Sequence, residues 1–355
     1  MSAPTVGAGD AAGAPPQRDT DALLDVRDLR TWFFTADGVV KAVDGVDISV
    51  GRGEVLGLVG ESGSGKSVSM FSALRLVSNP GRVVGGSVTF GGRDVLAMRR
   101  AELRELRGGH VSMIFQQPTG SLNPVYRVGA QIAEVYDVHE RLSRKAGEAK
   151  AVAMLTRVGI PDAARRARSF PHQMSGGMAQ RVMIAMALAA NPQLLIADEP
   201  TTALDVTIQA QILDLMRDLQ RDMGMAMVLI THDLGVVAEM AERVAVMYAG
   251  QIVEEASTHA VFKEPKHPYT HGLLGSIPVL GRRADELAVI PGRVPNLIDL
   301  PEGCRFAPRC EQRMAHCTQA LPALVDVSPG HRVRCFLHSD AIEAPVSVEL
   351  GRRKR

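Results

Sequence analysis

Residues 54–77, which read EVLGLVGESGSGKSVSMFSALRLV, decide the fold class of this 355-residue chain. Their first part is short, apolar and rich in Val and Leu, which predicts a buried strand, and the spacing after Lys66 predicts a helix. Between strand and helix, residues 60–67 match the phosphate-binding pattern G-x4-G-K-[ST]. The sequence therefore predicts an α/β fold whose glycine loop holds the phosphates of a nucleotide.

The chemistry of this loop follows from its residue types. Glycines let the backbone curl so that consecutive N–H groups point at phosphate oxygens, and the new helix adds its positive N-terminal end. Lys66 is expected to neutralise β- and γ-phosphate charge, and Ser67 to ligate Mg2+. The nucleotide-binding residues predicted from the loop are Gly60, Ser62, Gly63, Ser64, Gly65, Lys66, Ser67 and Val68.

Patterns on both sides of the loop extend the α/β prediction. Residues 24–53 alternate apolar and polar side chains and turn at Asp37-Gly38, which predicts an antiparallel β layer. Helical spacing at 128–158 indicates a helical insertion spanning about 120–190. After it, strand and helix patterns alternate, which predicts a parallel sheet; the segments are 193–200, 206–224 and 225–233.

Composition bounds the class of protein. Lys and Arg number 40 against 39 Asp and Glu, so charge gives no reason to expect a nucleic-acid partner. No stretch reaches the roughly 20 apolar residues that span a bilayer, and the N-terminus does not look like a secretory signal. We expect a disordered tail at 1–22, a nucleotide-binding domain at 23–255, a small domain at 256–340 and a flexible tail at 341–355.

Two acids end a second apolar strand, LLIADE at 194–199. Asp198 is the expected Mg2+ partner, and Glu199 lies where a carboxylate accepts a proton from the attacking water. Together with the glycine loop, this pair predicts a site that hydrolyses a nucleoside triphosphate.

A third motif, SGGMAQR at 175–181, opens a helix ahead of the acidic strand. Ser175, Gly176 and Gly177 at a helix start make a second anion site, one more than a single nucleotide needs. The surplus is explained if two chains face each other head-to-tail, each giving its glycine loop to one ATP and this motif to the other. The motif resembles the signature sequence of ABC ATPases, with Met178 where many relatives have Gln.

The resemblance to ABC ATPases implies roles for two further polar residues. Gln116 resembles the glutamine that contacts Mg2+ and water and links the site to the membrane subunits, with Gln117 as the alternative. His232 resembles the switch histidine that contacts the γ-phosphate. The catalytic residues implied are then Glu199, His232, Lys66 and Gln116, and the Mg2+ ligands are Ser67, Gln116 and Asp198.

The same resemblance covers the dimer contact and the base. Residues 203–205 resemble the D-loop, which ends at Asp205 and has Thr202 in place of the usual leading Ser. Phe33 is the best match to the aromatic side chain that stacks on adenine, with Trp32 and Phe34 as alternatives.

The tail narrows the resemblance to the ATPase subunits of oligopeptide and dipeptide importers. Residues 265–274, PKHPYTHGLL, resemble the His-Pro-Tyr element of that group, as do residues 291–310 and SLNP at 121–124. The resemblance implies an ATPase at the cytoplasmic face of the membrane that energises peptide import. Its implied partners are a second ATPase subunit, which in relatives is commonly a different chain, two permeases and an extracytoplasmic binding protein. Alternatives are another cargo (nickel, a sugar or a drug) or a soluble ABC ATPase outside transport.

All cysteines lie in this tail, at Cys304, Cys310, Cys317 and Cys335. Their wide spacing lacks the C-x2-C turn that most structural zinc sites use, and four thiolates suit a [4Fe-4S] cluster. Structural Zn2+ is the alternative, with a histidine substituting for one thiolate; the candidates are His316, His331 and His338. Reduced thiols or a disulfide pair without metal is the third interpretation.

Overall fold

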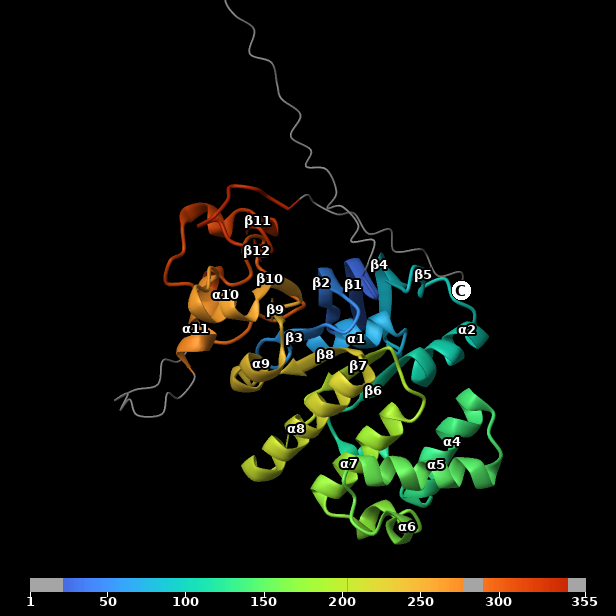
Figure 1. Cartoon of the computed structure of the whole chain (residues 1–355). Coiled ribbons are helices and arrows are strands. Elements are labelled where there is room, and N and C mark those ends of the chain that lie inside the picture. The colour runs from blue at the N-terminus through green and yellow to red at the C-terminus, as the bar shows by residue number, and fades with distance from the viewer. Residues whose placement is uncertain (1–21, 203, 277–289, 344–355) are drawn as a thin grey trace, which may run out of the picture.

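The computed structural model describes residues 22–202, 204–276 and 290–343, and Figure 1 shows how their elements are arranged. Within these ranges, no helix has the length and apolar character that a membrane span requires. Nearly all of both tails expected from the sequence lies outside the described residues.

An eight-stranded sheet forms the centre of the molecule, in the order β11-β12-β10-β9-β3-β8-β7-β6. β3 (Val55–Val59) lies between β8 (Ala226–Thr231) and β9 (Arg243–Tyr248), and all three are parallel. β7 (Leu194–Asp198) and β6 (Val111–Ile114) continue the parallel part. The carboxyl ends of parallel strands lie at one edge of a sheet, so the loops after β3, β7 and β8 meet there.

Apolar side chains of these strands divide between two hydrophobic cores. In β7, Leu195 and Ala197 pack into one core, whereas Leu194 and Ile196 pack into the other. Strands buried on both faces read as continuous apolar runs, which is why the sequence signal for β7 is strong. Three helices that follow strands of this sheet also contribute side chains to these cores: α1 (Lys66–Ala73), α8 (Val206–Met223) and α9 (Leu234–Met240).

The predicted antiparallel layer is present as a four-stranded sheet in the order β2-β1-β4-β5. β1 is the second strand and pairs with both β2 and β4. β4, whose centre reads VVGGSV, is a strand that the sequence patterns did not indicate, because its glycine pair interrupts the alternation. The bounds are β1 Leu24–Thr35, β2 Gly38–Val50, β4 Gly81–Phe90 and β5 Arg93–Asp94.

A helical part lies beside β6, as Figure 1 shows in green. Its helices fall within the stretch expected to be a helical insertion, and their apolar faces share one core with the sheet. They are α3 (Pro118–Ser121), α4 (Val128–Glu140), α5 (Arg144–Arg157), α6 (Ala163–Arg166), the 3-10 turn η2 (Pro171–Gln173) and α7 (Gly176–Leu188). α2 (Arg100–Glu105) and η1 (Leu106–His110) precede β6.

The C-terminal part, which comprises the described residues of 258–343, continues the central sheet. β10 (Gln251–Ser257) pairs with β9 on one side and with β12 (His331–Val333) on the other, and β11 (Val325–Ser328) follows at the edge. The domain boundary expected near residue 255 lies within β10, so the two parts share hydrogen-bonded strands. The remaining elements are α10 (Thr258–Lys263), α11 (Pro268–Gly275), η3 (Ala307–Arg309) and η4 (Ala315–Thr318).

A buried carboxylate, Glu254, joins the C-terminal part to β10. It accepts hydrogen bonds from the backbone N–H groups of Lys266 and His267, and its Oε1 lies 2.7 Å from His331 Nε2. Burial lowers the pKa of His267 to about 3, so the ring stays neutral and its Nδ1 accepts from the Tyr269 N–H at the start of α11. The His-Pro-Tyr element is therefore a helix cap held inside the protein.

Candidate nucleotide-binding site

The phosphate loop between β3 and α1 depends on two of its glycines. Gly60 has φ 148° and Gly65 has φ 105°, values that side-chain-bearing residues rarely adopt. A Cβ at Gly60 would lie 2.1 Å from the carbonyl oxygen of Met247, and one at Gly65 would lie 2.3 Å from that of Ala42. The loop therefore presses its backbone against β9 and β2, and only glycine fits at these two positions.

Lys66 and Ser67 begin α1 and face the acidic end of β7. Lys66 Nζ donates to the carbonyl oxygens of Gly60 at 2.7 Å and Glu61 at 2.9 Å, which holds the ammonium inside the loop. Ser67 Oγ donates to Asp198 Oδ1 at 2.8 Å, although 131 positions separate the two residues. Two hard oxygen donors are thus adjacent at the loop, a donor set that fits Mg2+.

Burial shifts the charges at this end of β7. It lowers the pKa of Lys66, against the opposing effect of Glu199, Asp198 and Glu61. It raises the pKa of Asp198, and the hydrogen bond from Ser67 opposes that rise. A bound cation at Asp198 would favour the ionised carboxylate in the same way.

Glu199 is held by three polar side chains. Its Oε2 accepts from Gln116 Nε2 at 2.8 Å and from Thr202 Oγ1 at 2.9 Å, and its Oε1 lies 3.3 Å from His232 Nδ1. Burial raises the pKa of Glu199, but the hydrogen bonds from Thr202 and His232 outweigh it and leave the pKa below its ordinary value. The carboxylate is therefore ionised at neutral pH and able to accept a proton.

The backbone at Glu199 is strained, with φ 47° in the left-handed region. Its N–H donates to the carbonyl oxygen of Ile230 at 2.8 Å, which ties the turn after β7 to β8. This turn directs the side chain toward Gln116 and His232.

The residues predicted as a signature lie in a separate hollow. Ser175 caps α7, and its Oγ accepts from the Met178 N–H at 3.3 Å. Asp205 caps α8 in the same way, with the Ile208 N–H 2.9 Å from its Oδ1. The two helix starts enclose a hollow of about 460 Å3, lined also by Gly176, Gly177, Met178, Arg181, Leu204 and Ile208. Ala203, predicted in the D-loop, lies outside the described residues.

Three aromatic side chains on β1 were candidates for stacking on adenine. Phe33 lies against Gly81, since a Cβ there would be 2.7 Å from its Cε1. Lys41 Nζ lies 5.2 Å from the centre of the Trp32 ring, and the Arg82 guanidinium lies equally far, 5.2 Å, from that of Phe34. Phe33 as the adenine-stacking residue stays a prediction.

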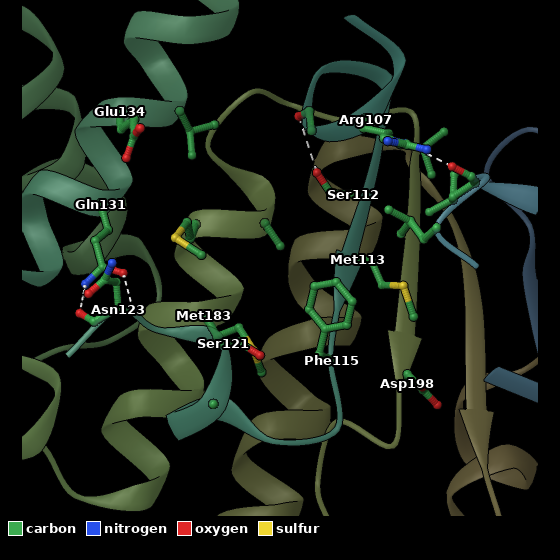
Figure 2. Close-up of a pocket in the computed structure, with 18 of the residues that line it drawn as sticks. Arg107, Ser112, Met113, Phe115, Ser121, Asn123, Gln131, Glu134, Met183 and Asp198 are labelled. Carbon is green, nitrogen blue, oxygen red and sulfur yellow. Dashed lines mark hydrogen bonds between the residues drawn. The ribbon is translucent and has the colours of Figure 1, made fainter. Parts of the chain in front are cut away.

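A large cavity of about 1390 Å3 opens between the sheet and the helical part. Figure 2 shows Asp198 at one end of it, Gln131 and Glu134 at the other, and the ring of Phe115 between them. Gln116 and Gln117 line the same cavity. Phe115 and, further out, Val125 and Tyr126 are exposed apolar side chains at or near its wall.

The four cysteines converge on one small cavity of about 10 Å3, together with His267 and Met314. Their donor chemistry suits a soft metal or cluster, but the volume admits about one water molecule. Within the described ranges, no group of three or more His, Cys, Asp or Glu side chains is arranged to hold a metal ion. Burial, together with the other three cysteines, raises the pKa of Cys335 to about 12, so a metal would have to displace thiol protons.

The structure brings together Ser67 of the loop, Asp198, Glu199, Gln116 and His232, which the sequence assigns to one site, and their roles stay predictions. Sequence reasoning missed some of the polar contacts there. It did not foresee that Thr202 would donate to Glu199, although the substitution in the D-loop pointed to that position.

A glycine phosphate loop, an acidic strand end and a second helix start with glycines define a P-loop nucleoside triphosphatase. Residues 43–202 match the family described as ABC transporter, and residues 253–317 match the oligopeptide/dipeptide transporter C-terminal region. The chain belongs to the ATP-binding proteins of ABC transporters that carry this C-terminal region. The α/β fold and the resemblance inferred from the sequence are thereby confirmed, and the chain is an ABC-type ATPase.

Individual relatives cover nearly the whole chain. A probable peptide ABC transporter ATP-binding protein of Sinorhizobium fredii is 52% identical over 324 residues, covering 91% of this chain and 97% of the relative. The oligopeptide transport ATP-binding protein OppD of Escherichia coli is 49% identical over 320 residues, covering 90% and 94%. A dimeric ATP-binding cassette solved after hydrolysis with ADP and Pi has a TM-score of 0.60 and 26% identity, covering 66% of this chain and 98% of that one.

Proposed function

We propose that this chain hydrolyses ATP to energise the import of di- or oligopeptides. The observation that carries the hydrolytic part is the set of contacts around Glu199, where Gln116, Thr202 and His232 all reach one carboxylate. The peptide cargo is supported by the C-terminal region at 253–317 and by relatives named for peptide transport.

Each part of the site has a role in this proposal. Lys66 leaves the loop carbonyls and binds the β- and γ-phosphates, and His232 holds the γ-phosphate. Ser67 and Asp198, with Gln116, would hold Mg2+, which when bound neutralises phosphate charge. Glu199 accepts a proton from the attacking water while Gln116 and Thr202 keep its carboxylate in place. Phe33 stacks on adenine.

The proposed partners follow from two surfaces. The hollow at Ser175 and Asp205 has none of the phosphate-loop residues in its lining, which supports a second ATPase subunit that brings its own ATP there. The cavity at Phe115 and Gln116 supports a permease contact, because its lining continues to Ser67 and Asp198. In this proposal the chain works at the cytoplasmic face of the membrane, with two permeases and an extracytoplasmic binding protein.

The cargo is tested by isolating the complex with its co-purifying permeases and binding protein. We expect the binding protein to bind peptides in calorimetry, and the peptide-loaded form to stimulate ATP hydrolysis by the reconstituted complex. Binding of nickel, a sugar or a drug with no response to peptides would overturn the peptide assignment. Isolation of the chain with no membrane partner would favour an ABC ATPase outside transport.

We further propose that Cys304, Cys310, Cys317 and Cys335 hold a [4Fe-4S] cluster, with Zn2+ as the alternative. The support is that four thiols from three separate segments line one cavity, which would have to widen to take a cluster. The cluster would staple a C-terminal part whose own apolar core is small, namely Ala307, Cys317 and Phe336.

Anaerobic purification followed by iron and sulfide assays tests the cluster. We expect brown protein with about four irons and four sulfides per chain, and loss of both in Cys310→Ser. Zinc in place of iron would favour the alternative. Colourless, metal-free protein after anaerobic reconstitution would rule out both.

A further inference from the structure

A carboxylate inside the phosphate loop needs a physical explanation. Glu61 is the second residue of the loop, and its negative charge raises the pKa of Lys66, the residue proposed to bind phosphate. Its side chain is 27% exposed, so solvent screens it only in part. An unpaired negative charge here would repel the phosphates of ATP.

Arg309 of the C-terminal part supplies the countercharge. Its Nη1 lies 3.0 Å from Glu61 Oε2, across 248 positions of sequence. The guanidinium is 6% exposed and also donates to Tyr248 Oη at 3.3 Å and to the carbonyl oxygen of Pro291 at 2.8 Å. It lies over the rings of Tyr248 and Phe306, 5.8 and 5.9 Å from their centres. These contacts fix the orientation of the guanidinium, so it pairs with Glu61 at little cost in conformational entropy.

Tyr269 anchors the backbone of the same residue. Its Oη accepts from the Glu61 N–H at 2.9 Å, and its ring packs against those of Tyr248 and Phe306. The Glu61 carbonyl oxygen in turn accepts from Lys66 Nζ at 2.9 Å. The C-terminal part therefore holds both the side chain and the backbone of the residue on which Lys66 rests.

A second arginine from the same segment reaches the middle of the loop indirectly. Arg305 donates to the carbonyl oxygen of Ala249 and pairs with Asp44. Gly250, which follows Ala249 in the sequence, donates its N–H to the Ser64 carbonyl oxygen at 2.8 Å. Arg305 and Arg309 each adjoin a cysteine, Cys304 and Cys310, so one seven-residue segment has both its thiols on one cavity. Of its two arginines, Arg309 contacts the loop directly and Arg305 does so through Ala249 and Gly250.

We propose that Arg309 and Tyr269 are positioning residues for ATP: Arg309 neutralises and holds Glu61, and Tyr269 fixes its backbone, so that Lys66 meets the phosphates undisturbed. The inference rests on the proposed nucleotide site. It gives the C-terminal part a share in nucleotide affinity, in addition to any role in cargo or metal binding.

The test measures the Kd for MgATP on the full chain by equilibrium binding, with Tm and with KM and kcat of the reconstituted complex. Arg309→Gln is expected to weaken ATP binding and raise KM about tenfold, because it leaves the Glu61 carboxylate unpaired beside the phosphates. Adding Glu61→Gln to that variant should restore most of the lost affinity. Tyr269→Phe, which removes only the hydroxyl, should weaken binding a few-fold with its aromatic packing intact.

Arg313→Gln is the matched control, since Arg313 is an exposed arginine three positions beyond Cys310, and it should leave Kd and KM unchanged. The inference is overturned if Arg309→Gln lowers only Tm and leaves Kd within twofold, or if the double variant binds ATP more weakly than Arg309→Gln. Should Arg309→Gln fail to fold, wild-type affinity in Tyr269→Phe would overturn it. Lys66→Ala separates the two proposals: undiminished ATP binding in that variant would refute the nucleotide site itself.

Discussion

Replacing Glu199 with Gln is expected to lower ATP turnover by roughly 10²- to 10⁴-fold, the usual contribution of a general base. The amide cannot take a proton from water, yet it keeps the size of the carboxylate and an oxygen that accepts from Thr202. ATP affinity should therefore stay close to that of the wild type. Phosphate release and equilibrium nucleotide binding, measured on the same preparation, separate the two effects.

The control for this substitution is Glu239→Gln on α9. Glu239 is an exposed carboxylate paired with Arg217 at 2.6 Å, and surface pairs of this kind contribute little to stability. The Glu239→Gln variant should hydrolyse ATP at the wild-type rate. Near-normal turnover in Glu199→Gln would remove Glu199 from the role of base, whereas loss of ATP binding would show that the carboxylate holds the nucleotide instead.

Ser175→Ala is expected to lower turnover on the order of 10²-fold, as removal of one donor to transition-state charge does. Binding of ATP at the phosphate loop of the same chain should not change, because Ser175 lies in a different hollow. Ser143→Ala is the matched control: Ser143 also caps a helix of the same part, accepting from the Ala146 N–H at 3.4 Å. Both variants lose a cap worth about 1 kcal/mol, but only one should lose activity.

Mixing two inactive variants tests the head-to-tail arrangement directly. A dimer of one Ser175→Ala chain and one Lys66→Ala chain has an intact phosphate loop from the first facing an intact signature from the second. Activity should therefore reappear on mixing. No recovery, together with weakened ATP binding by Ser175→Ala alone, would place both motifs at one nucleotide of one chain.

The parts of the site that sequence could predict are those set by local patterns. The strand, glycine loop and helix at 54–77 match a local pattern that indicates this arrangement, and the apolar run before Asp198 and Glu199 ends where β7 ends. Parallel strands bring their carboxyl ends together, so the contact between Ser67 and Asp198 follows from the fold class. The signature and D-loop were placed by resemblance, and the structure places the signature and the D-loop residues Leu204 and Asp205 around one hollow.

Other features depend on long-range contacts, which produce no periodic pattern in the sequence. The pair of Glu61 and Arg309 and the hydrogen bond from Glu61 to Tyr269 cross 248 and 208 positions. The boundary expected near 255 falls within β10, because the composition of the sequence changes there. The strand itself forms hydrogen bonds with β12 of the C-terminal part. Composition shows where the chain becomes rich in Pro and Gly. It does not predict which strand will pair with a strand later in the sequence.

That covering has a consequence for handling the protein. β10 offers a row of backbone groups along the side opposite β9, and β12 occupies part of it. In a chain cut after residue 257, this side would become a bare strand edge, a template on which further chains add. The C-terminal part thus covers an edge on which further strands could otherwise pair, and β11, the outermost strand of the sheet, is only four residues long.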